Sequence, residues 1–291
     1  MLIDAHHHFW QLGRFEYPWI EPELKPLQHN FGPIEFEPIL QRHHLHLTVL
    51  VQTIASVAET QWFLELCQRK DFIGGVVGWV DLADANVGAT LDQLRLQPGL
   101  VGIRHLVHDE PDTGWLLRED VVRGLREVAA RALPYDLLIR PPHLAASCTL
   151  ARQLPELQLV VDHMAKPEIA SHGWQPWATG LKKLAQCENV FCKISGLVTE
   201  ADWENWRVEE LKPYVQHAIE CFGPSRLMYG SDWPVCLLAS TYDRVIEAAQ
   251  ACISVLSPSE QSQIMGVTAA RFYNLPATAD AASARRRAHH P

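Results

Sequence analysis

The 291-residue sequence lacks the features that mark several large classes of protein. No apolar run approaches the roughly 20 residues that a membrane span requires, and the N-terminal MLIDAHHHFWQ has neither the basic nor the apolar region of a secretion signal. The seven cysteines form no Cys-x-x-Cys pair, which disfavours a zinc ribbon or a dithiol redox site. We therefore expect a cytoplasmic protein with reduced thiols and no contact with a membrane.

Positive charge is also scarce. The 25 Lys and Arg residues stand against 34 Asp and Glu residues, which gives a net charge of −9 and no support for nucleic-acid binding. No G-x-G-x-x-G or P-loop follows the first apolar run, which disfavours nucleotide binding. The hydrophobic fraction of 47% and the charged fraction of 20% are ordinary for a globular protein.

Eight apolar or β-branched runs alternate along the chain with segments of helical spacing. Most of these runs are nearly continuous in apolar residues, as in parallel strands that are covered on both faces. The predicted strands cover residues 2–8, 47–53, 74–82, 100–108, 135–140, 157–163, 190–195 and 227–231. Eight strands separated by helices fit a closed (β/α)8 barrel of the TIM type better than an open doubly wound sheet. We therefore expect a single α/β domain over residues 1–275.

The connecting segments are less uniform. Three helices are predicted from shared apolar stripes, formed by Val57, Phe63, Leu64 and Cys67, by Val121, Leu125, Val128 and Ala132, and by Leu211, Val215, Ile219 and Phe222. Pro213 is compatible with the last of these if it lies in the first turn. Residues 12–38 are rich in proline and have no strong period, so we expect a long, lid-like loop over the first strand's C-terminal end. Residues 276–291 predict a disordered, solvated tail with basic residues near its end.

A histidine cluster ends the first predicted strand. Because strand residues alternate between faces, His6 and His8 point to one side and His7 points to the other. If that side faces the barrel interior, two imidazoles converge at the C-terminal mouth, where barrel enzymes place their sites. This spacing suits a divalent metal ion. A pair of hydrogen-bonded histidines at a strand end is the alternative.

A second candidate follows the last strand, in Gly-Ser-Asp-Trp-Pro. Closure of a barrel brings the last strand beside the first, so Asp232 can approach His6 and His8. Such an aspartate could bind a metal ion or accept the proton of an attacking water. A helix cap or a turn before the proline is the structural alternative.

Two lysines and a third histidine lie at the ends of the sixth and seventh strands. His163 could supply another imidazole, and Lys166 could reach a carbonyl oxygen or a substrate hydroxyl, unless it is a surface lysine. Lys193 lies within an otherwise apolar strand, where an unpaired ammonium group costs several kcal/mol. It therefore needs an acidic partner or a functional reason, and we favour a catalytic role.

Further candidates for substrate binding lie at the same end of the predicted barrel. Arg104 and His105 cannot both face inward from the fourth strand, and we choose Arg104. Arg140 and His143 follow the fifth strand, and His143 is our choice there. Trp10 and Trp233 could each stack on a sugar ring, with packing as the alternative; Trp10 is retained as a substrate-binding residue.

Taken together, these motifs resemble the amidohydrolase superfamily. They are Ile-Asp-Ala-His-His-His-Phe-Trp at residues 3–10, Val-Asp-His-x-Ala-Lys-Pro at 161–167, Lys-Ile-Ser-Gly-Leu at 193–197 and Gly-Ser-Asp-Trp-Pro at 230–234. The resemblance is closest to its amidohydrolase-related branch, which includes L-fucono-lactone and L-rhamnono-lactone hydrolases, and it spans residues 2–275.

The resemblance implies a (β/α)8 barrel that hydrolyses a small-molecule sugar lactone in sugar catabolism. It implies a site with His6, His8, His163 and Asp232, in which one divalent metal ion, Zn²⁺ first, is bound or is dispensable. Relatives with two metals bridge them with a carboxylated lysine on the fourth strand, where this chain has Arg104, so a bridged pair is not expected. A dicarboxylate lactonase, a metal-dependent decarboxylase, and a non-catalytic sugar- or metal-binding barrel are the alternatives. Assembly into homo-oligomers is left open.

Overall fold

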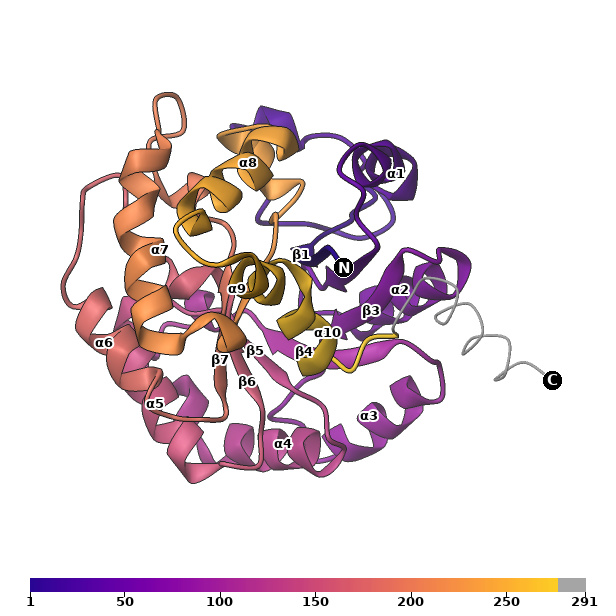
Figure 1. The fold of residues 1–291 in the computed structure, drawn as a ribbon. Helices are drawn as coiled ribbons and strands as arrows, with labels where there is room; N and C mark the ends of the chain where they lie inside the picture. The colour runs from indigo at the N-terminus through magenta and orange to yellow at the C-terminus, as the bar shows by residue number, and fades with distance from the viewer. Residues whose placement is uncertain (277–291) are drawn as a thin grey trace.

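The computed structural model describes residues 1–276 and shows eight parallel strands in the order β1 to β8, each paired with the next (Figure 1). Their bounds are Ile3–His7 (β1), Leu47–Val51 (β2), Ile73–Gly78 (β3), Leu100–His105 (β4), Tyr135–Leu137 (β5), Leu159–Val161 (β6), Val190–Ile194 (β7) and Leu227–Tyr229 (β8). All eight predicted strands are confirmed. Most are shorter than predicted at the C-terminal end, because the chain there turns away to build the mouth of the barrel.

The helices surround these strands or cover the end at which the strands begin (Figure 1). They are Pro33–Arg42 (α1), Val57–Arg69 (α2), Val87–Arg95 (α3), Glu119–Ala130 (α4), Leu144–Gln153 (α5), Trp177–Leu184 (α6), Val208–Phe222 (α7), Tyr242–Ile253 (α8), Pro258–Ser262 (α9) and Thr268–Phe272 (α10). Apolar side chains from the strands and the inner helix faces bury one another, which explains why the strands read as continuous apolar runs. The (β/α)8 barrel and its single domain are thus confirmed.

The barrel closes between its first and last strands. His7 pairs with Trp233 in a parallel bridge. Asp232 donates its backbone N–H to His6 O at 2.8 Å, and His8 donates its N–H to Trp233 O at 2.7 Å. These bonds fix the backbone that carries His6 and His8 directly against the backbone that carries Asp232.

Several local expectations were wrong. Residues 33–38, predicted as loop, form the start of α1, where Pro33 occupies a favourable first-turn position. Pro213 is the sixth residue of α7 rather than part of its first turn. Ala132 lies beyond α4 in a left-handed conformation, with φ of 54°, so it does not extend that helix's apolar stripe. The predicted tail lies outside the described residues, apart from Pro276.

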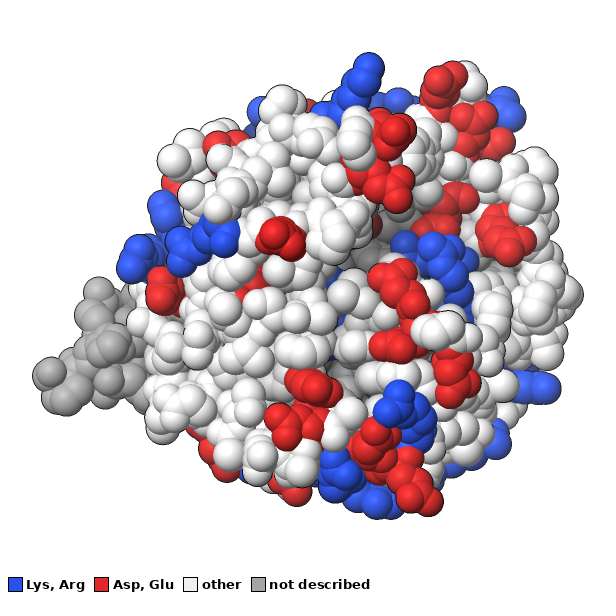
Figure 2. Space-filling view, turned by 180° about the vertical axis from the view of Figure 1, so that it is seen from behind, with Lys and Arg blue, Asp and Glu red and all other residues white. Residues whose placement is uncertain are grey.

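The two ends of the barrel differ. The segment from α9 to α10 covers the end at which the strands begin, and this is the side that faces the viewer in Figure 1. The strands' C-terminal ends therefore open on the opposite side, which is the side seen in Figure 2. Within the described residues, no helix is long and apolar enough to span a membrane.

Candidate active site

A cavity of about 210 Å³ opens at the C-terminal end of the barrel. Loops that follow six different strands build its wall. The polar part of the wall includes His8, Thr53, Arg104, His163, Lys166 and Asp232, and the apolar part is Trp19, Leu106, Leu138 and Val235. On this face, acidic and basic side chains are mixed around a hollow, without an extended basic area (Figure 2). This mixture agrees with a small-molecule site.

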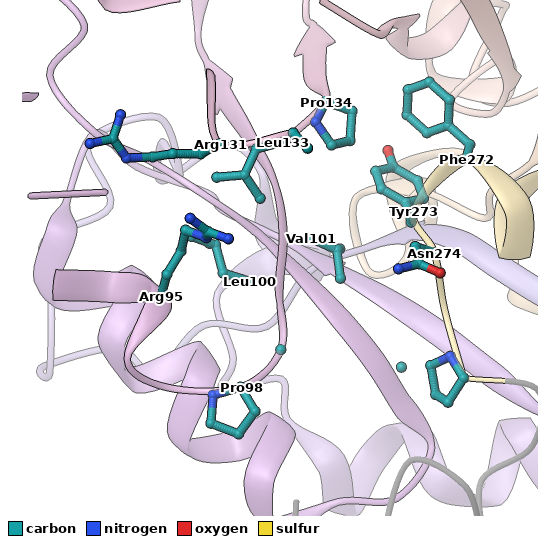
Figure 3. Close-up of a pocket in the computed structure, with 14 residues that line it drawn as sticks. Arg95, Pro98, Leu100, Val101, Arg131, Leu133, Pro134, Phe272, Tyr273 and Asn274 are labelled. Carbon is teal, nitrogen blue, oxygen red and sulfur yellow. The ribbon is translucent and has the colours of Figure 1, made fainter. Parts of the chain in front are cut away.

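A second cavity, of about 540 Å³, lies at the other end of the barrel beside Tyr273 and Asn274 (Figure 3). Its Arg131 is already paired with Asp92 at 2.7 Å and with Glu127 at 2.6 Å. The histidines of the sequence motifs lie at the opposite end of the strands. We therefore place the candidate active site at the C-terminal mouth, the usual position in such barrels.

His6, His8 and Asp232 meet in that mouth. The two Nε2 atoms of His6 and His8 lie 3.1 Å apart. Asp232 Oδ1 lies 3.3 Å from His8 Nε2 and 3.7 Å from His6 Nε2. The alternation rule holds, because His7 points away and its Nε2 contacts Thr48 Oγ1 at 2.9 Å.

His163 completes the group from the end of β6. Its Nε2 lies 3.9 Å from Asp232 Oδ1, and its Nδ1 lies 2.9 Å from Ser195 Oγ. Gly196 makes this approach feasible: its φ is +61°, and a Cβ atom there would lie 2.6 Å from His163 Nδ1. The third imidazole therefore depends on a glycine in the loop after β7.

The protonation of His8 is fixed by the backbone. A carbonyl oxygen can only accept, so the 2.8 Å contact with Val51 O places a proton on His8 Nδ1. The lone pair of Nε2 consequently faces His6 Nε2 and the carboxylate of Asp232. Two imidazole nitrogens and a carboxylate oxygen converging in this way form the donor set of a divalent-cation site. In tetrahedral coordination two nitrogens each 2.0–2.1 Å from zinc lie roughly 3.3 Å apart, close to the distance seen here.

Burial sets the charge of these groups. Desolvation lowers the pKa of His6 and of His8 below the ordinary value, and lowers that of His163 to about 4. Burial alone would raise the pKa of Asp232, but the surrounding imidazoles outweigh it and hold that pKa below its usual range. The site at neutral pH is thus an ionised carboxylate among neutral imidazoles.

A layer of buried charges lies beneath the histidines. Lys193 Nζ contacts Asp136 Oδ2 at 2.6 Å and Asp162 Oδ1 at 3.0 Å. Arg104 pairs with the other oxygen of Asp162 at 3.0 Å, and Tyr273 donates its hydroxyl to Asp136 at 2.7 Å. Two cations and two carboxylates therefore balance inside the barrel, where an unpaired charge would be costly.

This layer contacts the site through His6. Lys193 Nζ lies 3.1 Å from His6 Nδ1, and Asp162 Oδ1 lies 3.3 Å from the same atom. Lys193 is fully buried and does not line the cavity. Asp136 and Asp162 are the acidic partners that a buried lysine requires. Lys193 contacts His6 but does not reach the cavity, so it can position His6 but cannot touch a substrate.

Two of the four predicted substrate-binding residues line the cavity, and two do not. Arg104 and Lys166 line the cavity; Lys166 Nζ is bound to Glu200 at 2.8 Å. His143 is buried beside the cavity wall's β5 loop, with its Nδ1 turned to the backbone N–H of Arg140, and it does not line the cavity.

Trp10 is also outside the cavity. It is 1% exposed, and its Nε1 donates to His29 O at 2.7 Å. Its ring packs edge-on against Trp19 at 5.2 Å, and Trp19 is the tryptophan that lines the cavity. The expected aromatic wall is present, but it comes from the loop that precedes α1.

Sequence reasoning missed several residues of the site. Asp162 lies within a quoted motif, and its position beside His163 was an available signal. Asp136 lies in the short strand β5 and is the acidic partner expected for the buried Lys193. Thr53 ends the predicted second strand, and its place at the C-terminal end of a strand was an available signal. Trp19 lies in a connection without periodicity, so only the folded chain shows that it reaches the cavity.

Comparison with known proteins identifies the family. The family model described as Amidohydrolase matches residues 3–275. The chain belongs to the amidohydrolase family. Two proteins named L-fucono-1,5-lactonase are similar to it: that of Burkholderia ambifaria is 36% identical over 94% of this chain and 95% of its own length, and that of Burkholderia multivorans is 37% identical over 96% and 98%.

Solved amidohydrolase structures agree with this membership. An amidohydrolase from Burkholderia multivorans, solved with bound HEPES and again with bound zinc, has a TM-score of 0.91 and 35% identity over 95% of this chain and all of that one. A probable 2-pyrone-4,6-dicarboxylic acid hydrolase from Acinetobacter baumannii has a TM-score of 0.74 at 20% identity over 94% of this chain and 99% of that one, a likeness of fold alone.

Proposed function

We propose that this amidohydrolase, a lactone hydrolase, opens a sugar lactone, with L-fucono-1,5-lactone as the first substrate to test. The observation that carries the proposal is the ionised Asp232 held beside His6 and His8 at the floor of a small polar cavity. Full-length similarity to two L-fucono-1,5-lactonases supports the substrate class. The cytoplasmic location and the oligomeric state stay predictions.

In the proposed reaction a water molecule attacks the lactone carbonyl and Asp232 accepts its proton. The carbon–oxygen bond of the ring then breaks, and Asp232 returns the proton to the departing ring oxygen. Ser195 Oγ is placed to donate to His163 Nδ1, which leaves the Nε2–H of His163 free to donate to the carbonyl oxygen. Lys166 Nζ, although paired with Glu200, keeps N–H groups that can donate to the substrate at the cavity wall. Lys193 acts through His6 and is a positioning residue.

The donor set of His6, His8 and Asp232 fits a divalent cation, because unprotonated nitrogen and a carboxylate oxygen converge on one point. His163 Nε2 lies 3.9 Å from Asp232 Oδ1, and in the tautomer that donates to the carbonyl oxygen it stays outside this donor set. A bound cation would polarise the carbonyl and acidify the attacking water. Zn²⁺ is the proposed ion, as bound in the Burkholderia multivorans amidohydrolase.

A dicarboxylate substrate is a poorer match to this cavity. Recognition of two carboxylates calls for several free arginines, whereas Arg104 is the arginine that lines the wall and it is paired with Asp162. A non-catalytic binding barrel does not need a carboxylate base between the imidazoles.

The test is a lactone panel followed by a pH indicator, with aldonolactones and pyrone dicarboxylates compared at equal concentration. We expect turnover of aldonolactones, and a loss of about 10²–10⁴-fold in kcat for Asp232→Asn, as for removal of a general base. Circular dichroism must show a folded variant. Full turnover by the folded variant, or a preference for pyrone dicarboxylates, would refute the assignment.

A further inference from the structure

The loop after β2 carries a hydroxyl that the proposed reaction does not use. Thr53 lines the cavity, and its own backbone N–H donates to Glu59 Oε2 at 2.8 Å. The next N–H, of Ile54, donates to the same oxygen at 3.2 Å. Thr53 Oγ1 donates to the other oxygen, Glu59 Oε1. One buried carboxylate of α2 thus binds three successive donors of this loop.

The other side of the loop is fixed as well. Gln52 donates its N–H to Val77 O at 2.8 Å, and its carbonyl oxygen accepts a hydrogen bond from Arg104 Nη2. The loop that carries Thr53 is therefore held from β3 and β4 through Gln52, and from α2 through Glu59. A side chain fixed in this way gives a substrate little freedom to reorient it, which is the condition for selective recognition.

The polarity of Thr53 follows from its partner. A hydroxyl has one proton and two lone pairs. The proton is committed to Glu59, so Oγ1 can offer only lone pairs to the cavity, and no other partner of Oγ1 is found in the described part of the chain. A group that approaches Oγ1 must donate. A sugar hydroxyl can do this, whereas a carboxylate oxygen or an ether oxygen cannot.

We propose that Thr53 is a specificity-determining residue of this lactonase, accepting a hydrogen bond from one ring hydroxyl of the substrate, with Glu59 as the positioning residue that holds its proton. The inference rests on the proposed function and extends it: the substrate is a polyhydroxy lactone with a donor at one defined carbon. It also gives a reason for discrimination against substrates that present only acceptors at that carbon.

The first experiment pairs substitutions of Thr53 with deoxy substrates. Thr53→Val removes the oxygen while keeping the shape, and Thr53→Ser keeps it. For the parent aldonolactone we expect kcat/KM to fall about tenfold in the Val variant, the size of one neutral hydrogen bond, and to stay within about twofold in the Ser variant. For the one deoxy lactone that lacks the bound hydroxyl, wild type and Thr53→Val should be equally fast.

The second experiment reverses the direction of the hydrogen bond between Thr53 and residue 59. In Glu59→Gln the amide N–H donates to Thr53 Oγ1, which frees the Thr53 proton for the cavity. The preference for a hydroxyl over fluorine at the recognised carbon should then shrink by about tenfold, because fluorine can only accept. Glu65→Gln, an exposed position on the same helix, is the matched control and should keep the wild-type ratio.

The pH dependence of substrate preference in the wild-type enzyme is a further test, because a purely structural role of Glu59 would not change that preference. Burial raises the pKa of Glu59 to about 7, although the hydrogen bonds from Thr53 and Ile54 and the charge of Arg104 lower it; Tyr17 also faces Glu59 among the described residues. A protonated Glu59 can donate to Thr53, so the hydroxyl-to-fluorine ratio should fall on going from pH 8 to pH 6, and Glu59→Gln should abolish that change.

The outcomes separate the two proposals. No turnover of any lactone by the wild type would remove the proposed function and this inference with it. Turnover by the wild type, with Thr53→Val as fast as wild type on the parent lactone, would overturn the inference alone. An unchanged hydroxyl-to-fluorine ratio in Glu59→Gln would overturn the positioning role of Glu59.

Discussion

Replacement of Lys193 by Met tests the charge balance beneath the site. The lysine is fully buried, and its Nζ lies 2.6 Å from Asp136 and 3.0 Å from Asp162. After the change, Asp162 keeps Arg104 at 3.0 Å, but among the described residues the side chain of Asp136 keeps only the hydroxyl of Tyr273. One buried carboxylate is thus left without a cation, and the free energy of unfolding should fall by about 3–5 kcal/mol.

The assay is urea unfolding at pH 7, in which the midpoint falls while the slope stays constant. The double variant Lys193→Met/Asp136→Asn removes both charges of the buried pair, and we expect it to recover about half or more of the loss, because close charges couple strongly in such cycles. Lys183→Met, at an exposed position of α6, should change stability by no more than about 0.5 kcal/mol. A loss below about 1 kcal/mol, or a double variant as unstable as the single one, would refute the charge-balance argument.

Three further predictions follow from other features of the site. Gly196→Ala should cost about 1–2 kcal/mol and lower kcat, because φ is +61° and the new Cβ would lie 2.6 Å from His163 Nδ1; an active, equally stable variant would contradict this. Since the pKa of Glu59 is about 7 when folded and 4.5 in the unfolded chain, the folded state retains a proton that the unfolded state releases, and Glu59 should contribute a loss of about 3 kcal/mol in stability as pH rises from 4.5 to 7. Asp4, Asp136 and the buried histidines titrate in wild type and in Glu59→Gln alike, so the difference in unfolding free energy between the two proteins isolates this contribution; a difference that does not change with pH would exclude Glu59. Wild type should bind about one equivalent of zinc by elemental analysis and melt at a lower temperature after chelation, whereas His8→Ala should bind much less; equal metal content would remove His8 from the site.

The sequence alone predicts the barrel and the meeting of its first and last strands. The strands are recognisable as continuous apolar runs because both of their faces are buried, and eight such strands predict a closed barrel. The proximity of His6, His8 and Asp232 could be predicted for the same reason. Each lies at the end of a strand, and the order of strands in a closed barrel says which strands are neighbours. The side of each histidine follows from the two-residue period of a strand.

The residues that line the mouth from loops could not be predicted in the same way. Trp10 is the predicted stacking residue because it adjoins the histidines in sequence, yet the chain turns after Trp10 and buries it, and Trp19 lines the cavity instead. His143 follows a strand end, but its ring turns back onto its own loop. Loop conformation depends on contacts distant in sequence, such as that between Arg104 and the backbone of Gln52, and a single sequence carries no period that reveals them.

The bonds between the backbones of His6 and Asp232, and between those of His8 and Trp233, have a consequence for biosynthesis. During synthesis the imidazole pair is made long before Asp232, which lies more than 200 residues further along the chain, so the site cannot assemble until the eighth strand has been made. Two fragments divided between β4 and β5 would each hold half of the chemistry, and their reassociation would be reported directly by the return of lactone turnover.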